Sequence, residues 1–123
     1  MSTFLLASSS VHTSAAACDY LGGRLTDGDT VMVLGVDEPD VPDRDVGDAI
    51  NVARARLAPA TVWTERREGD PVEAVLALAA DIGADELVLG QRGGDPDREA
   101  AGLGSTVAAV AGEAERPVVV VPV

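Results

Sequence analysis

The residues best suited to chemistry lie in two short segments rich in glycine and hydroxyl side chains. The first runs Gly90-Gln91-Arg92-Gly93-Gly94, and the second, Gly104-Ser105-Thr106, opens the last expected helix. Glycines bring bare backbone N–H groups close to a ligand, and a helix start adds unpaired amides and the positive end of its dipole. Arg92 and the two hydroxyls would add further donors. The two segments therefore predict a phosphate-binding site. The alternative interpretation is that the same residues only form tight turns and a helix cap.

A serine run, Ser8-Ser9-Ser10, follows the first apolar segment and is the other candidate group. His12 is the single histidine of the chain, and so the one conventional partner for a serine nucleophile, but no Gly-x-Ser-x-Gly elbow accompanies it. We therefore interpret the run as an anion contact or a helix cap. His12 and the single Cys18 cannot supply the three or four Cys or His ligands of a zinc site. No catalytic residue and no metal ligand is assigned, and a carboxylate-rich metal site stays open.

Charge excludes several classes of function. The nine basic residues are all arginine and face 21 acidic residues, which gives a net charge of −12. The absence of lysine excludes a Walker A loop, Schiff-base catalysis and the protein-kinase signature. A pI near 4.2 disfavours nucleic acid as a partner. Such acidity is typical of a salt-adapted (halophilic) protein, because molar salt screens repulsion between carboxylates; an acidic protein from an ordinary GC-rich genome is the alternative.

The length of 123 residues predicts one domain over 1–123, and the 46% hydrophobic content excludes a disordered chain. The apolar runs are far shorter than the roughly 20 residues that span a bilayer, so no membrane association is expected. The first residues lack the basic region of a signal peptide and are interpreted as a strand. A cytoplasmic location is therefore expected.

Five β-prone segments alternate with helical patterns, as βαβ units require. The strands are expected at 3–7, 30–36, 60–67, 86–89 and 118–123, with the charged third strand at a sheet edge. Right-handed crossovers then give an α/β fold: a doubly wound, five-stranded parallel sheet of order 3-2-1-4-5 with helices on both faces. Ligands of such sheets bind at the carboxyl edge, beside the first and fourth strands. The acidic stretch 37–45 is expected to be a solvated loop.

Helical periodicity predicts which side chains face the sheet. The expected inward faces are Val11, Ala15, Cys18, Gly22 and Leu25 in the first helix, Val46, Ile50, Ala53 and Leu57 in the second, Val72, Val75, Leu76, Ala79 and Ile82 in the third, and Val107, Val110, Ala111 and Ala114 in the last, from about 104 to 115. Asp70-Pro71 and Gly83 are start and stop signals for the third helix. Trp63, on the edge strand, is expected to be half-buried, with a contact surface as the alternative interpretation.

The second half of the chain resembles the universal stress protein family. The resemblance rests on Gly69-Asp70-Pro71, on 83–90, on the glycine loop, on Gly104-Ser105 and on 116–122, and it continues more faintly over 3–57. Nucleotide-binding members carry a glycine, two residues, a glycine, nine residues, then glycine and Ser/Thr. Here nine residues separate Gly94, rather than Gly93, from Gly104, which a one-residue loop insertion explains.

The resemblance implies a Rossmann-like fold of the adenine nucleotide alpha hydrolase type and a stress-response regulatory role with ATP or a related adenine nucleotide as ligand. By its matching positions, adenine would lie against Val36, with Leu89 and Ala7 lining the pocket. Ser8 stands where the family usually has an aspartate, which weakens the case for magnesium. For each of Ala7, Val36 and Leu89, plain core packing is the competing interpretation.

Three functions follow from these observations. The first is a nucleotide-binding regulatory protein; the second is an interaction protein of the same fold with a degraded pocket, which Ser8 and the altered spacing favour. The third is a slow ATPase, the most catalysis the sequence allows, since it shows neither a general base nor a secure magnesium ligand. The strand expected at Val118 to Val123 is an apolar edge without charge or bulge, and together with the resemblance it predicts a homodimer through that strand.

Overall fold

The computed structural model describes residues 1–39, 41–57, 60–91 and 104–122. Its elements alternate strictly in type: β1 (Thr3–Ala7), α1 (Val11–Gly22), β2 (Thr30–Asp37), α2 (Asp43–Arg56), β3 (Thr61–Glu68), α3 (Pro71–Ile82), β4 (Glu86–Gly90), α4 (Ser105–Glu113) and β5 (Val118–Val121). All five strands are parallel and lie in the order β3-β2-β1-β4-β5. The expected fold class and strand order are confirmed. The last strand is shorter than expected, because it ends at Val121 before Pro122.

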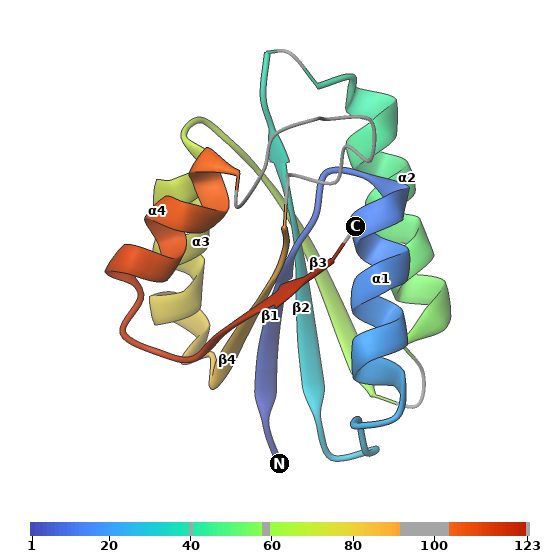
Figure 1. The fold of residues 1–123 in the computed structure, drawn as a ribbon. Coiled ribbons are helices and arrows are strands. Elements are labelled where there is room, and N and C mark those ends of the chain that lie inside the picture. The colour runs from blue at the N-terminus through green and yellow to red at the C-terminus, as the bar shows by residue number, and fades with distance from the viewer. Residues whose placement is uncertain (40, 58–59, 92–103, 123) are drawn as a thin grey trace.

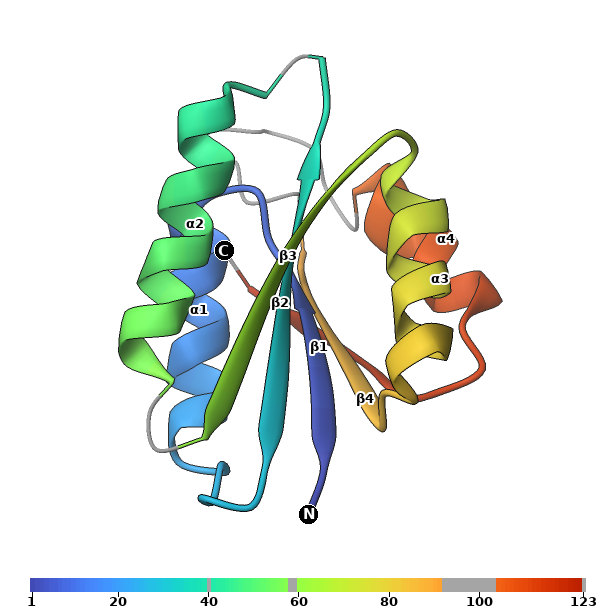
Figure 2. The same cartoon turned by 180° about the vertical axis from the view of Figure 1, so that it is seen from behind.

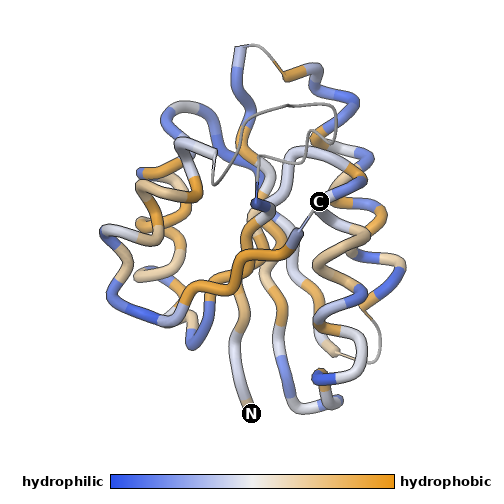
Figure 3. The backbone as a smooth tube through the Cα atoms, viewed as in Figure 1, coloured by the Kyte–Doolittle hydropathy of each residue, from blue (hydrophilic) through white to orange (hydrophobic). Residues whose placement is uncertain are grey.

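Helices cover both faces of the sheet: α1 and α2 lie on one face, and α3 and α4 on the other (Figure 1; Figure 2). Successive residues of each strand point to opposite faces, so one strand supplies two cores. Leu6, Val33 and Val88 pack beneath α1 and α2. Leu5 and Leu87 pack beneath α3 and α4. The strands other than β3 are accordingly mostly apolar, and many hydrophilic residues lie on outer helix surfaces and turns (Figure 3).

The expected inward face of α1 is confirmed only in part: Cys18 is buried and Leu25 packs against the core, whereas Val11 is 40% exposed and Gly22 is also exposed. Its buried residues are Thr13, Ser14, Ala17, Cys18 and Leu21. The hydropathy pattern failed because two hydroxyl residues are buried here: Ser14 Oγ donates a hydrogen bond to the backbone carbonyl of Ala49 on α2, at 2.7 Å, which satisfies its polar group. Cys18 is buried as expected, and that burial raises the pKa of its thiol.

The acidic stretch after β2 is shorter than expected, since α2 already begins at Asp43. Asp43 and Asp45 lie in the first turn of α2, where a negative charge interacts favourably with the helix dipole. The expected inward face of this helix is confirmed, because Val46, Ile50, Ala53 and Leu57 are all buried. Close packing of α2 against the sheet explains the glycine at position 35 of β2, because a Cβ there would lie 2.4 Å from Val46 Cγ1.

The third helix follows its sequence signals. The Asp70 carboxylate accepts a hydrogen bond from Val72 N at 2.9 Å, and Gly83 ends the helix with φ +62°. Val75 and Ala79 are buried as expected, whereas Val72, Leu76 and Ile82 are only partly buried. The expected inward face is therefore rotated slightly: Ala74 and Leu78 complete the buried set.

The last helix spans 105–113, shorter than the expected 104–115. Val107 and Val110 are buried as expected, Ala114 is partly buried and Ala111 is exposed. Trp63, on the edge strand β3, is 60% exposed rather than half-buried. Within the described ranges, no helix has the length and hydropathy needed to cross a membrane.

Candidate functional site

A cleft opens at the carboxyl ends of β1, β2 and β4. The chain leaves β1 for α1 on one face, and leaves β4 for α4 on the other, so this edge is the point where the sheet reverses its winding and where parallel sheets bind ligands. The residues lining the cleft come from all three strands, from α1, α3 and α4, and from the segment after β2. They are Ala7, Ser8, Ser9, Thr13, Leu34, Val36, Glu38, Pro71, Val75, Leu89, Gly90, Thr106 and Val107.

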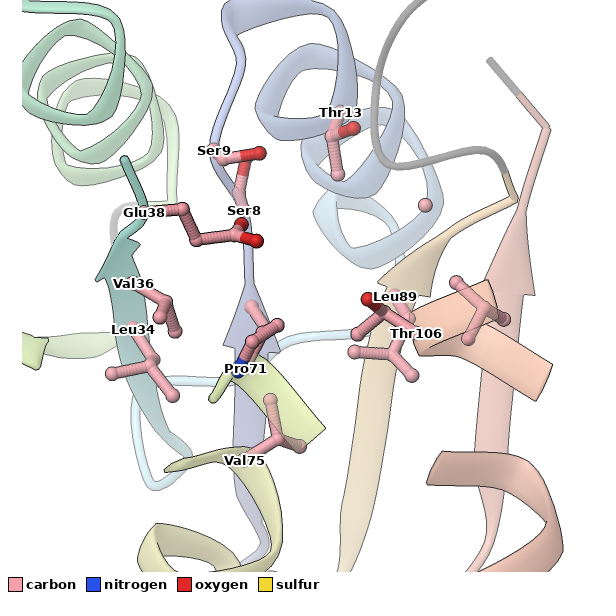
Figure 4. Close-up of a pocket in the computed structure, with 13 residues that line it drawn as sticks. Ser8, Ser9, Thr13, Leu34, Val36, Glu38, Pro71, Val75, Leu89 and Thr106 are labelled. Carbon is pink, nitrogen blue, oxygen red and sulfur yellow. The ribbon is translucent and has the colours of Figure 1, made fainter. Parts of the chain in front are cut away.

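The cleft has an apolar floor and a polar rim (Figure 4). Leu34, Val36 and Val75 form part of the floor, and Thr106 lies across from them beside Leu89. Glu38 extends from the end of β2 towards Ser8 and Ser9. A flat apolar ring fits such a floor, while the rim can make hydrogen bonds to polar substituents.

Seven of the candidate site residues named in the sequence line this cleft: Ala7, Ser8, Ser9, Val36, Leu89, Gly90 and Thr106. Gly104 and Ser105 adjoin it at the start of α4 but do not line it. Arg92, Gly93 and Gly94 lie outside the described residues. His12 is exposed on α1 and is not part of the lining, so the serine run and the histidine do not form a pair at the cleft.

The Ser8 hydroxyl is engaged inside the protein. Its oxygen lies 2.9 Å from the Ser10 carbonyl oxygen and 2.9 Å from Ser14 Oγ. Ser14 gives its proton to Ala49 O, so the single proton of Ser8 is divided between the two contacts. Ser8 can therefore only accept a hydrogen bond from a ligand. A contact to an anion requires a hydrogen-bond donor, which Ser8 does not provide.

Gly90 has a packing explanation as well as a possible role in binding. A Cβ at this position would lie 2.6 Å from Thr13 Oγ1 and 2.9 Å from Thr13 Cγ2 on α1. Thr13 is only 2% exposed, so it has little room to move. The φ of Gly90 is not positive. Close approach of α1, rather than a tight turn, is thus what requires glycine at the end of β4.

The start of α4 lies beside the end of β4. Gly104 N donates to Gln91 O at 2.9 Å, and Gln91 N donates to Val121 O at 2.9 Å, which ties the helix start to the sheet. Gly104 is the N-cap residue, with φ −64° and ψ 160°. Since glycine has no side chain to cap the helix, the first-turn amides are left to other acceptors, and the dipole favours an anion there.

Glu38 is a charged residue of the site that the sequence did not indicate. Among the described residues that line the cleft, it carries the one acidic side chain. Its place directly after a strand that ends at the carboxyl edge was the available signal, but the residue was grouped with a solvated loop. Thr13, Pro71, Val75 and Val107 also line the cleft without having been expected there, because only the packing of α1, α3 and α4 brings them to the edge. Leu34 of β2 is a further lining residue that the sequence did not single out.

The lining can take a flat apolar ring on the floor and an anion at the start of α4. The described residues enclose about 80 Å³, whereas pockets for ligands of this size reach roughly 300 Å³ or more. The cleft therefore surrounds part of such a ligand. In the described ranges, no group of three His, Cys, Asp or Glu side chains is placed to hold a metal ion.

Comparison with known proteins identifies a family and a shared fold. A model of the universal stress protein family matches residues 25–122. No curated protein sequence matches the chain. The hypothetical protein MJ0577 has a similar solved structure, with a TM-score of 0.83, 18% identity, and coverage of 99% of this chain and 96% of that one.

Two further structures contain nucleotides. A universal stress protein in complex with cAMP has a TM-score of 0.70 at 22% identity, covering 98% of this chain and 96% of that one. The universal stress protein from Archaeoglobus fulgidus in complex with dAMP has a TM-score of 0.66 at 17% identity, covering 98% of both chains. At such identities the likeness shows a shared fold. The fold, together with a family model that spans most of the sequence, shows that the chain belongs to the universal stress protein family.

Proposed function

We propose that this protein is a regulatory member of its family that binds ATP or a related adenine nucleotide in the cleft at the carboxyl edge of the sheet. The observation that carries the proposal is the pairing, in one cleft, of an apolar floor with the start of α4. Two structural neighbours that were solved with cAMP and dAMP support adenine as the base. Gly104, Ser105 and Thr106 would hold a phosphate, and Ala7, Val36 and Leu89 would contact the base.

The first test is direct binding. We expect protein purified without added ligand to release adenine nucleotide on denaturation, as detected by anion-exchange chromatography. After the nucleotide is removed, ATP at one hundred times its dissociation constant should stabilise the fold by about 2.7 kcal/mol. Thermal shifts should be recorded both in dilute buffer and at about 1 M salt, because a chain of net charge −12 is exposed to strong self-repulsion when screening is weak.

An interaction protein without a ligand is the second candidate, and the small enclosed volume of the cleft favours it. The same measurements separate the two. If no nucleotide is released and no adenine nucleotide shifts the melting temperature at either salt concentration, the protein is an interaction protein without a nucleotide ligand.

We also propose a homodimer that pairs two copies of β5. Val118, Val119 and Val120 are partly exposed on this edge strand, which has no neighbour beyond it among the described strands. Two copies paired about a twofold axis would satisfy the free backbone groups of both edges.

A charge on β5 tests this dimer. Val119→Asp should convert a dimer to a monomer, because two like charges would face each other across the paired strands. Val121 is unsuitable for the same test, since it is 3% exposed and a charge there would disrupt the core. Thr61→Asp, on the exposed position of the opposite edge strand β3, is the matched control. Sedimentation velocity should show a monomer for the first variant and a dimer for the control; two dimers would rule out pairing through β5.

A further inference from the structure

One wall of the cleft presents acceptors. The Glu38 carboxylate can accept hydrogen bonds but not donate them, and the proton of Ser8 is already committed to Ser10 O or Ser14 Oγ. The opposite wall, at the start of α4, presents amide donors. A ligand that matches both walls needs hydrogen-bond donors at one end and an anion at the other. A phosphate cannot face Glu38, because the two negative charges would repel each other.

Glu38 is held in place from both sides of its segment. Arg66 of β3 donates from Nε and Nη2 to the carboxylate of Asp37, the residue before Glu38, and Nη2 also donates to the Asp43 carbonyl at 3.2 Å. The Glu38 carbonyl accepts a hydrogen bond from Val41 N at 3.1 Å. Arg66 thus joins the end of β2 to the start of α2 and limits where Glu38 can reach.

The position of Glu38 in the cleft decides which donors it meets. Figure 4 places its side chain near Ser8 and Ser9, nearer the rim than Leu34 and Val75 of the floor. An adenine ring on that floor, with its phosphate at Thr106, would present the sugar between the two walls. The amino group of the base would lie deeper, among apolar side chains.

We propose that Glu38 accepts hydrogen bonds from the 2′- and 3′-hydroxyls of a bound adenine ribonucleotide, and that Arg66 is the positioning residue for this contact. The inference rests on the proposed function and adds to it the class of ligand: nucleotides with a free ribose diol bind more tightly than their dideoxy counterparts. A carboxylate is suited to this task because its two oxygens can accept from both hydroxyls at once.

The test is a set of calorimetric titrations of the full chain with AMP, 2′,3′-dideoxy-AMP, IMP and ATP, in EDTA and again with Mg²⁺. Wild type should bind AMP on the order of tenfold more tightly than dideoxy-AMP. Glu38→Gln keeps the shape, removes the charge and leaves one acceptor oxygen in place of two, so it should bring this ratio closer to one by weakening AMP binding alone. Glu68→Gln is the matched control, because Glu68 is exposed at the end of β3 and does not line the cleft.

Each other outcome contradicts the inference in its own way. If Glu38→Gln leaves the AMP to dideoxy-AMP ratio unchanged, Glu38 does not contact the sugar. If it removes a preference for AMP over IMP instead, Glu38 contacts the base amino group. If Glu38→Gln binds ATP more tightly than wild type does, the carboxylate faces phosphate. If Glu38→Gln changes nucleotide affinity only when Mg²⁺ is present, the carboxylate holds the metal. A wild-type protein that binds none of the four ligands fails the proposed function itself.

Arg66 gives an independent test of positioning. Arg66→Ala should reduce the ratio of AMP to dideoxy-AMP affinity severalfold, and it should have no further effect on that ratio in the Glu38→Gln background. A purely structural role would lower the melting temperature of both backgrounds and leave the ratio as it is in wild type, which would overturn the assignment.

Discussion

Replacing Gly35 with alanine is expected to lower the free energy of unfolding by about 3 kcal/mol, the upper part of the range for overpacked cores. The added Cβ would lie 2.4 Å from Val46 Cγ1 and 3.0 Å from Ile50 Cδ1. Val46 is fully buried and β-branched, so it can neither rotate nor retreat without moving α2 from the sheet. For a chain of this length, the loss corresponds to a fall of roughly 10 °C in the melting temperature.

Two variants show whether this contact is the cause. Gly112→Ala adds the same methyl group on α4, where nothing lies within 4 Å, and it should leave stability unchanged or raise it slightly. Val46→Ala removes the obstructing methyl groups, so the double variant Gly35→Ala, Val46→Ala should be more stable than the sum of the two single changes predicts. Strict additivity in chemical denaturation would mean that Val46 is not what restricts position 35.

The largest functional effect is expected from Gly104→Asp, which should weaken nucleotide binding by on the order of a hundredfold or more. A carboxylate at the N-cap of α4 would accept from the first-turn amides and repel the phosphate that would otherwise occupy them. Folding should persist, because the φ and ψ of Gly104 suit any residue and aspartate is a preferred N-cap. Titration with ATP, with circular dichroism to check the fold, measures both effects.

Gly104→Asn separates charge from shape. Asparagine also caps helices and has nearly the same size, but it is neutral, so it should weaken ATP binding much less than aspartate does. Adenosine, which has no phosphate, should bind the two variants almost equally well. If aspartate and asparagine reduce ATP affinity to the same extent, the anion does not bind at the start of α4.

The fold could be predicted because its signals are local and agree with one another. Each element has its own signal: valine enrichment marks strands such as Thr30–Asp37, and α3 begins after Asp70 and ends at Gly83. The alternation of strands and helices then leaves few possible topologies. The face of α1 could not be predicted in this way. Ser14 is buried because Ala49 of α2 offers it a carbonyl, and no pattern within α1 records that partner.

The same limit applies to the site. Motif spacing led to the glycines and to the start of α4, because those features are continuous in the sequence. Thr13 belongs to the cleft only through the packing of α1, and Gly90 has a packing role that depends on Thr13, whereas Glu38 follows β2 directly in the sequence. The acidic neighbours of Glu38 in the sequence indicate only a solvated loop, and not a position in the cleft.

The two edge strands of the sheet, β3 and β5, differ in charge, and this difference limits how many copies of the chain can assemble. β5 is uncharged, whereas β3 carries Glu65, Arg66, Arg67 and Glu68 along its second half, with Arg67 bound to both Glu65 and Asp81. Charged side chains on a border strand discourage another strand from adding there. In the proposed dimer, the two outer edges would both be β3 strands with charged second halves, so growth into a filament would stop at two copies.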